Sequence, residues 1–122
     1  MSDITTPAAI ERRLKQLGVE LDEANKHLAE AELNYMMSKA AYEVNSAAAR
    51  MSIKRKASEA GSKVTVAEVE DEAILHCRDD MSNYYTSEAI VRAARANISR
   101  VKTQVDIARS IGTSVRVSMD LA

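Results

Sequence analysis

The sequence predicts an all-α fold: a long antiparallel helical hairpin that assembles into an oligomeric helical bundle. The chain of 122 residues contains twenty Ala but only three Gly and one Pro, and it has no Phe or Trp. This composition favours long, closely packed helices over sheets, which need aromatic and β-branched residues and frequent turns. Apolar residues also recur at coiled-coil spacing. Because large apolar side chains are few, we expect a partner subunit to complete the core.

The first helix is expected over about residues 10–60. Thr6 suits the N-cap position, and Pro7 suits the first position of the helix. From there, apolar residues alternate at steps of four and three, which is the spacing of a coiled coil. They are Ile10, Leu14, Leu17, Leu21, Ala24, Leu28, Ala31 and Tyr35. This line predicts the face that packs within the hairpin.

A second apolar line lies on roughly the opposite side of the same helix, because successive residues are about 100° apart. Its members are Leu33, Met37, Ala40, Val44, Ala47 and Met51. A hairpin buries only one face of each helix, so a second apolar face predicts a further helix from another subunit. We therefore expect a homo-oligomer with these six residues at the oligomer interface.

A tight connection is expected at about residues 61–65, followed by a second helix over about 66–111. Gly61 is a natural helix terminator, and Thr65 with Glu68 forms a capping box. Apolar residues then recur at Ile74, Cys77, Met81 and Tyr84, and again at Ile90, Ala94, Ile98, Val101, Val105 and Ala108. The short connection makes the two helices antiparallel neighbours.

Residues 112–122 are expected to form a short C-terminal tail, because Val115, Val117, Met119 and Leu121 alternate with polar residues. Alternation of this kind suits a short strand or a segment that docks elsewhere, and both interpretations stay open. With no linker or internal repeat in between, residues 1–122 are expected to form a single helical domain.

Charge is segregated along the chain, although the net charge is only −1. Residues 50–67 and residues 89–122 each sum to +4, whereas residues 68–88 sum to −6. Arg95, Lys102 and Arg109 are seven residues apart, which places them on one side of a helix at intervals of about 10 Å. Such a row can follow a phosphate backbone. The candidate nucleic-acid-binding residues are Arg50, Lys54, Arg55, Lys56, Lys63, Arg92, Arg95, Lys102 and Arg109.

A structural interpretation of these cations stays open. They can form a solvated face that pairs with the acidic block of a neighbouring subunit. Lys54, Arg55 and Lys56 also suit the negative end of a helix dipole.

No set of residues predicts an enzyme, a metal site or a cofactor. His76 and Cys77 are adjacent and His27 is far away in sequence, so no zinc-ligand spacing occurs. Cys77 falls on an apolar line, so we expect a buried, inert thiol. Asp79 and Asp80 are expected to belong to a solvated face. Tyr84 and Tyr85 form the one aromatic pair, in which a ring can stack on a base or fill the helix interface.

The chain carries no predicted targeting or membrane segment. A lone cysteine excludes an internal disulfide and fits a reducing cytosol. The first residues lack a basic region followed by an apolar run, and no stretch approaches eighteen apolar residues. We expect a cytoplasmic protein.

Several segments together resemble a known family. The first predicted helix carries Ala31-Glu32-Leu33-Asn34-Tyr35 and Lys39-Ala40-Ala41-Tyr42-Glu43, and it ends in Lys54-Arg55-Lys56 before a turn with Gly. Thr65-Val66-Ala67-Glu68 begins the second helix, which closes with Val105-Asp106-Ile107-Ala108-Arg109-Ser110-Ile111-Gly112. Over roughly residues 20–116, this layout resembles the UvsY-like phage recombination mediators.

The resemblance implies an all-helical, ring-forming oligomer that binds single-stranded DNA. It further implies assistance in loading a RecA-like recombinase in place of single-strand-binding protein. Lys54-Arg55-Lys56 stands where that family has a basic DNA-contacting motif, with a different residue order. We expect a mediator of this kind, in the bacterial host cytosol if phage-encoded. The alternative is a purely structural coiled-coil oligomerisation or adaptor protein of a phage, with no nucleic-acid role.

Overall fold

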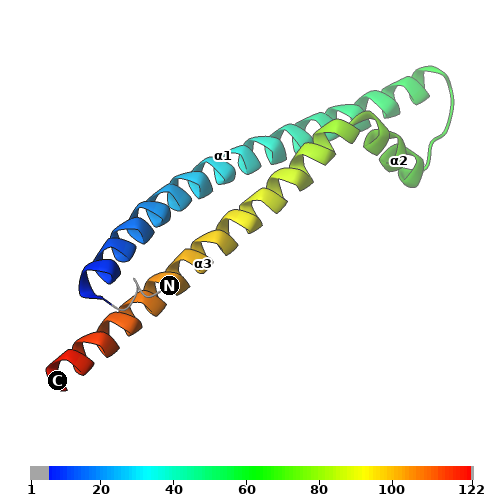
Figure 1. Cartoon of the computed structure of the whole chain (residues 1–122). Helices are drawn as coiled ribbons and strands as arrows, with labels where there is room; N and C mark the ends of the chain where they lie inside the picture. Colours follow the sequence, from blue (N-terminus) through cyan, green and yellow to red (C-terminus); the bar gives the residue numbers. More distant parts are fainter. Residues whose placement is uncertain (1–5, 122) are drawn as a thin grey trace. The chain divides into compact units, whose positions relative to one another are not determined.

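The computed structural model describes residues 6–121, and within this range the chain is all-helical with no strand. Three helices follow one another: α1 (Pro7–Glu59), α2 (Val66–His76) and α3 (Arg78–Leu121). The two long helices, α1 and α3, pack together (Figure 1). The predicted all-α class is therefore confirmed.

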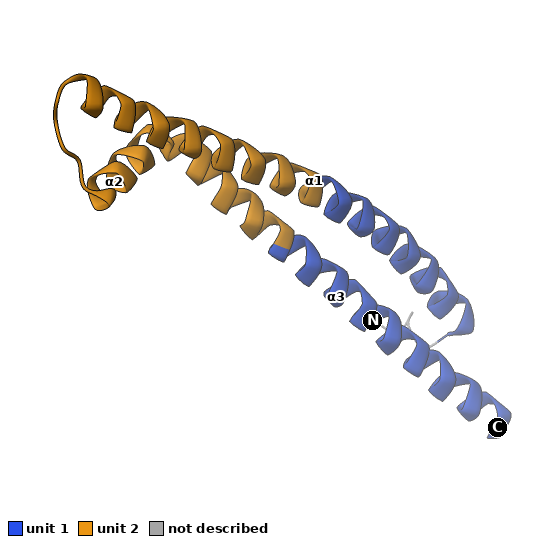
Figure 2. Cartoon of the chain, turned by 180° about the vertical axis from the view of Figure 1, so that it is seen from behind, with its two compact units in different colours: residues 1–30, 92–122 blue, residues 31–91 orange. Residues whose placement is uncertain are grey.

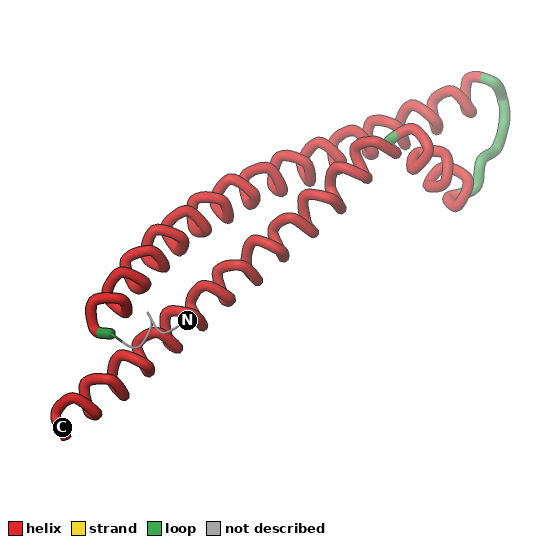
Figure 3. Tube along the Cα trace, viewed as in Figure 1, coloured by secondary structure: helices red, strands yellow, loops and turns green. Residues whose placement is uncertain are grey.

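The ends of α1 form as the sequence predicts. The Ala9 N–H donates to the Thr6 side-chain oxygen at 3.1 Å, so Thr6 is the N-cap. At the other end, Gly61 has a positive φ of 70° and the Ser62 N–H donates to the Ala57 carbonyl at 2.9 Å. This six-to-one hydrogen bond with a left-handed glycine is a Schellman motif, which ends α1 and begins the connection drawn in green in Figure 3.

The predicted second helix over 66–111 begins at the right place but is interrupted. Thr65 caps α2 by accepting the Glu68 N–H at 3.1 Å. The helix then breaks at Cys77, whose backbone leaves the helical region (φ −105°, ψ 21°) before α3 begins at Arg78. No Gly or Pro marks this position. Cys77 is buried at this break.

The predicted non-helical tail over 112–122 is wrong for the described residues 112–121, which continue α3 to Leu121. Gly112 and Val115 are half-buried and extend the coiled-coil steps of Ala108 by four and then three residues. The alternating Val117, Met119 and Leu121 are exposed, so their period does not reflect packing. The half-buried Gly112 and Val115 thus agree with a continued helix, whereas the alternation of the last residues does not describe which side chains are buried.

The chain was expected to be a single domain, whereas its contacts divide it into two compact units (Figure 2). Unit 1 comprises residues 1–30 and 92–122. Its core contains Leu17, Val101 and Ala108, against which Leu14, Leu21 and Val105 pack. The Arg13 guanidinium donates to the Gln104 side-chain oxygen at 3.0 Å beside this core.

Unit 2 comprises residues 31–91 and contains α2. Ile53 of α1 packs with Val69 and Ala73 of α2, and Ala49 packs against this cluster. All four tyrosines also gather here: the Tyr84 ring lies 5.8, 5.5 and 5.2 Å from the rings of Tyr35, Tyr42 and Tyr85.

Two apolar positions of the second helical segment differ from the prediction. Ile90 was expected on the buried line, but it is exposed and Val91 is buried instead. Ile74 is likewise exposed, and Ala73 is buried in its place. The step from Val91 to Ala94 is three residues, which keeps the coiled-coil alternation with Ile98, so the neighbouring helix selects Val91.

Candidate nucleic-acid interface

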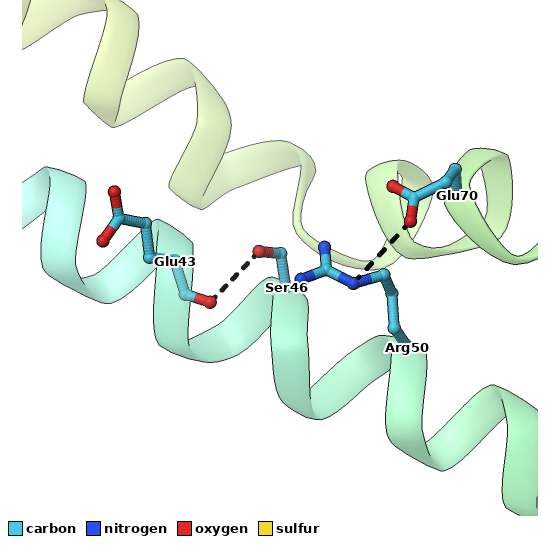
Figure 4. Close-up of polar contacts among 4 residues, drawn as sticks. All are labelled: Glu43, Ser46, Arg50 and Glu70. Carbon is cyan, nitrogen blue, oxygen red and sulfur yellow. Dashed lines mark hydrogen bonds and ion pairs between the residues drawn. The ribbon is translucent and has the colours of Figure 1, made fainter.

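The first basic block lies in unit 2, at the end of α1 and in the connection. Lys54, Arg55, Lys56 and Lys63 are exposed, whereas Arg50 is half-buried. The Arg50 Nε lies 3.7 Å from the Glu70 Oε1 on α2, and Figure 4 shows this ion pair beside the Ser46 hydroxyl that donates to the Glu43 carbonyl. One of the five predicted cations is therefore paired within the chain.

Helix α2 brings further acidic groups to this block. Lys56 lines a cavity of about 390 Å³ together with Glu72, His76 and Asp80. The Asn45 side chain donates to the Asp80 carboxylate at 2.9 Å at the same place. Glu70 and Glu72 of α2 thus lie near the end of α1, and they offset part of its positive charge.

The second basic block lies on α3 in unit 1. Arg92, Arg95, Lys102 and Arg109 are exposed there. Because α3 continues to Leu121, it adds Arg116, which is also exposed and seven residues beyond Arg109. The sequence prediction missed Arg116, although the seven-residue interval could have identified it, because residues 112–122 were not expected to be helical. We define the α3 stripe as Arg95, Lys102, Arg109 and Arg116.

The cations of the α3 stripe are exposed. Within residues 6–121, none of its four cations makes an ion pair. Arg109 and Arg116 line the same groove, a cavity of about 530 Å³, and Glu11 is the one acidic residue among the described residues that line it. The stripe presents four exposed cations at intervals of about 10 Å, with Asp106 and Asp120 on the same helix.

The two basic blocks belong to different units, so each is a candidate surface by itself. The structure brings Arg50 and Lys56 together with acidic residues of α2 within unit 2. It aligns the α3 stripe on one helix within unit 1. Arg92 precedes the stripe, three residues before Arg95, and does not share its seven-residue interval.

The six residues expected at an oligomer interface form one face of α1, here called the uncovered face, and five of them are exposed in the part of the chain that the structure describes. Leu33, Met37, Val44 and Met51 are 60–72% exposed. Ala40 is exposed and Ala47 is half-buried. The opposite face of the same helix carries Tyr35 and Tyr42, which pack on Tyr84. Among the described residues, the face of Tyr35 and Tyr42 thus packs within the chain, and the opposite apolar face is largely exposed.

The remaining chemical candidates are the cysteine, the acidic residues and the tyrosine pair. Cys77 is buried, and within residues 6–121 no three His, Cys, Asp or Glu side chains are grouped to hold a metal ion. Tyr84 fills the tyrosine cluster, and the more exposed Tyr85 stacks on it. The pKa of Tyr84 is raised above its ordinary value of 10.0, mainly by a hydrogen bond with Tyr35 and then by burial.

Comparison of this chain with protein-family models, curated proteins and solved structures found no match. Among the described helices, none combines the length and the apolar character needed to span a bilayer.

Proposed function

We propose that this chain is a non-enzymatic, oligomeric helical-hairpin protein that binds single-stranded DNA. It acts as a phage recombination mediator that assists loading of a RecA-like recombinase in place of single-strand-binding protein, in the host cytosol if phage-encoded. The observation that carries the proposal is the α3 stripe, four solvated cations that repeat every seven residues along one helix.

A nucleic-acid backbone is the ligand that best matches this arrangement. Arg95 and Arg116 are separated by about 31 Å along the helix, at about 1.5 Å per residue. A positive path of this length can follow several nucleotides of a single strand, whose phosphates bind Lys and Arg without regard to sequence. A compact anionic ligand would instead need cations that converge on one point.

Contacts within each unit support the antiparallel hairpin. In unit 1, Ile10 approaches Gly112 and Arg13 bonds Gln104, so later residues of α1 meet earlier residues of α3. In unit 2, Asn45 bonds Asp80.

The uncovered apolar face supports the oligomer, because large exposed apolar groups along one stripe are typical of protein interfaces. Oligomerisation would also multiply weak phosphate contacts into useful avidity.

A second candidate function is supported by the Arg50–Glu70 ion pair. In this alternative, the basic end of α1 serves to dock acidic α2, and the chain is a structural coiled-coil or adaptor protein with no nucleic-acid role. The cavity that Lys56 shares with Glu72 and Asp80 fits the same interpretation. The structural alternative explains the first basic block, but it assigns no role to the α3 stripe.

Binding of a labelled single-stranded oligonucleotide at several salt concentrations tests the proposal. For single strands, log K falls by about 0.7 per phosphate neutralised for each unit of log salt. The variant R95Q/K102Q/R109Q/R116Q should therefore bind more weakly, with a shallower slope. The matched control R12Q/K15Q/K26Q/R100Q removes four exposed cations of unit 1 outside the stripe and should keep most of the affinity.

If the unaltered protein ignores single-stranded DNA even at low salt, the mediator function fails and the structural alternative replaces it. If both quadruple variants lose affinity equally, net charge rather than the α3 stripe governs binding.

A further inference from the structure

The uncovered face of α1 has a spacing that reads the same in both directions. Its residues, Leu33, Met37, Ala40, Val44, Ala47 and Met51, follow one another at steps of four, three, four, three and four. This order is symmetric about position 42. When two such faces meet with opposite chain directions, Leu33 therefore lies level with Met51 of the second copy, Met37 with Ala47, and Ala40 with Val44.

The side-chain sizes also favour opposite directions. Each smaller residue in the middle of the face meets a larger one, because Ala47 lies level with Met37 and Ala40 with Val44. In a parallel pair each residue would meet itself, which gives layers of two alanines and layers of two methionines. Close packing of a helix interface favours layers of similar total volume, so the antiparallel pairing is better filled.

Charges at the two ends of the face agree with the same direction. On the continuous helix α1, Glu30 precedes Leu33 by three residues and Lys54 follows Met51 by three, and both are exposed. These positions are again equidistant from position 42. An antiparallel pair places each Glu30 against the Lys54 of the other copy, whereas a parallel pair places Glu30 against Glu30 and Lys54 against Lys54.

From these three agreements we infer that the face binds the same face of a second copy of this chain, antiparallel, around a two-fold axis level with position 42. The contact is isologous, so the same six residues serve both copies. The inference rests on the oligomerisation part of the proposed function and adds the partner surface, direction and register. Tyr42 itself packs on Tyr84 on the other side of α1, so the axis passes beside Ala41 and Glu43.

Cysteine cross-linking measures which residues of the two copies lie level with each other. The chain suits this experiment because Cys77 is its one native cysteine and is buried. In a C77A background, A41C should link to itself through a short bis-maleimide. L33C should not link to itself, since the two sites would lie about 27 Å apart at about 1.5 Å per residue. A mixture of L33C and M51C chains should give the mixed product. Circular dichroism and sedimentation of C77A alone establish that the background keeps its fold and assembly.

Charge exchange gives a second readout that needs no cysteine. E30K alone and K54E alone should each weaken association in sedimentation experiments. In an antiparallel pair, position 30 of each copy meets position 54 of the other, so either single variant creates two contacts between like charges. The double variant E30K/K54E should recover association. In a parallel pair, like charges meet in every case, so the double variant would gain nothing over the single variants.

The outcomes separate this inference from the function on which it rests. Self-linking of A41C, L33C and M51C alike would show a parallel pair, and an oligomer in which none of them links would show that another face is used. Either result overturns the inference and leaves oligomerisation intact. A monomer at micromolar concentration would overturn the oligomeric part of the proposed function itself, while single-stranded DNA binding is measured separately.

Discussion

Gly112 on α3 and Ile10 on α1 approach so closely that a Cβ atom on Gly112 would lie 3.3 Å from the Ile10 Cγ2. The coiled-coil line of α3 therefore continues through Gly112, where the glycine leaves room for Ile10. Gly18 of α1 is the opposite case, because it is exposed and has nothing within 4 Å of its open side.

These two glycines predict different responses to the same substitution. G18A should stabilise the protein by about 0.5–1 kcal/mol, because alanine restricts the unfolded chain and favours helix. G112A should gain less, since the added methyl group must displace Ile10 by a few tenths of an ångström. Thermal or urea unfolding of both variants measures the difference. Equal stabilisation would show that Ile10 moves aside freely.

The α3 stripe predicts that Arg116 contributes to binding single-stranded DNA although it lies beyond the helix expected from the sequence. R116Q should weaken binding by a similar factor on oligonucleotides of different sequence, because phosphate contacts carry no base information. It should also lower the slope of log K against log salt by up to about 0.7. R100Q is the matched single control, since Arg100 is on the same helix and is hydrogen-bonded to Asn97.

The two basic blocks are expected to contribute unequally to the affinity for single-stranded DNA, which is tested by removing three cations from each. K54A/R55A/K56A should reduce affinity for single-stranded DNA less than K102A/R109A/R116A. The reason is that Glu72 of α2 and Asp80 of α3 share a cavity with Lys56, whereas Glu11 is the one acidic residue among the described residues that line the groove of Arg109 and Arg116. Titrations at one low salt concentration compare the two triple variants. A larger loss from the first variant would assign the main DNA contact to the end of α1.

The uncovered apolar face predicts a loss of assembly without loss of folding. Val44 is 66% exposed within one chain, so V44D should keep the helical content while dissociating the oligomer, where the new charge would be buried without a partner. V19D is the matched control, because Val19 is 60% exposed on the same helix and lies outside the six-residue face. Sedimentation and circular dichroism of both variants separate assembly from folding; unchanged sedimentation of V44D would contradict the prediction.

The tyrosine cluster predicts a stability change at alkaline pH. The pKa of Tyr84 is raised above 10.0, so the folded state favours the neutral phenol. This contribution to stability is fully present below about pH 10 and is lost as pH rises through the raised pKa. Because the Tyr35 hydrogen bond is the largest cause, Y35F should shift the pKa of Tyr84 downward.

Tyrosinate absorbance followed against pH measures that shift. Y85F is the comparison variant, because Tyr85 is the last of the causes that raise the pKa of Tyr84 and should have a smaller effect. An identical titration for Y35F and the unaltered chain, after allowance for the missing ring, would show that the hydrogen bond does not control the ionisation.

The sequence by itself determined the elements whose cause is local. Thr6, Gly61 and Thr65 act at helix ends through their own backbone and side-chain chemistry, so those ends could be placed in advance. The line from Ile10 to Tyr35 and the opposite uncovered face also follow from spacing along a single helix. The seven-residue interval of Arg95, Lys102 and Arg109 belongs to the same class.

Only the tertiary structure decided the features that depend on which side of a helix meets a neighbour. No Gly or Pro marks the break at Cys77. The coiled-coil steps that fit Val91 and a helix through Gly112 and Val115 compete in the sequence with other spacings, namely Ile90 to Ala94 and the alternation from Val115 to Leu121. Packing between helices selects one of them. The same contacts paired Arg50 with Glu70, removing one predicted cation from the interface, and helix continuation added Arg116 to it.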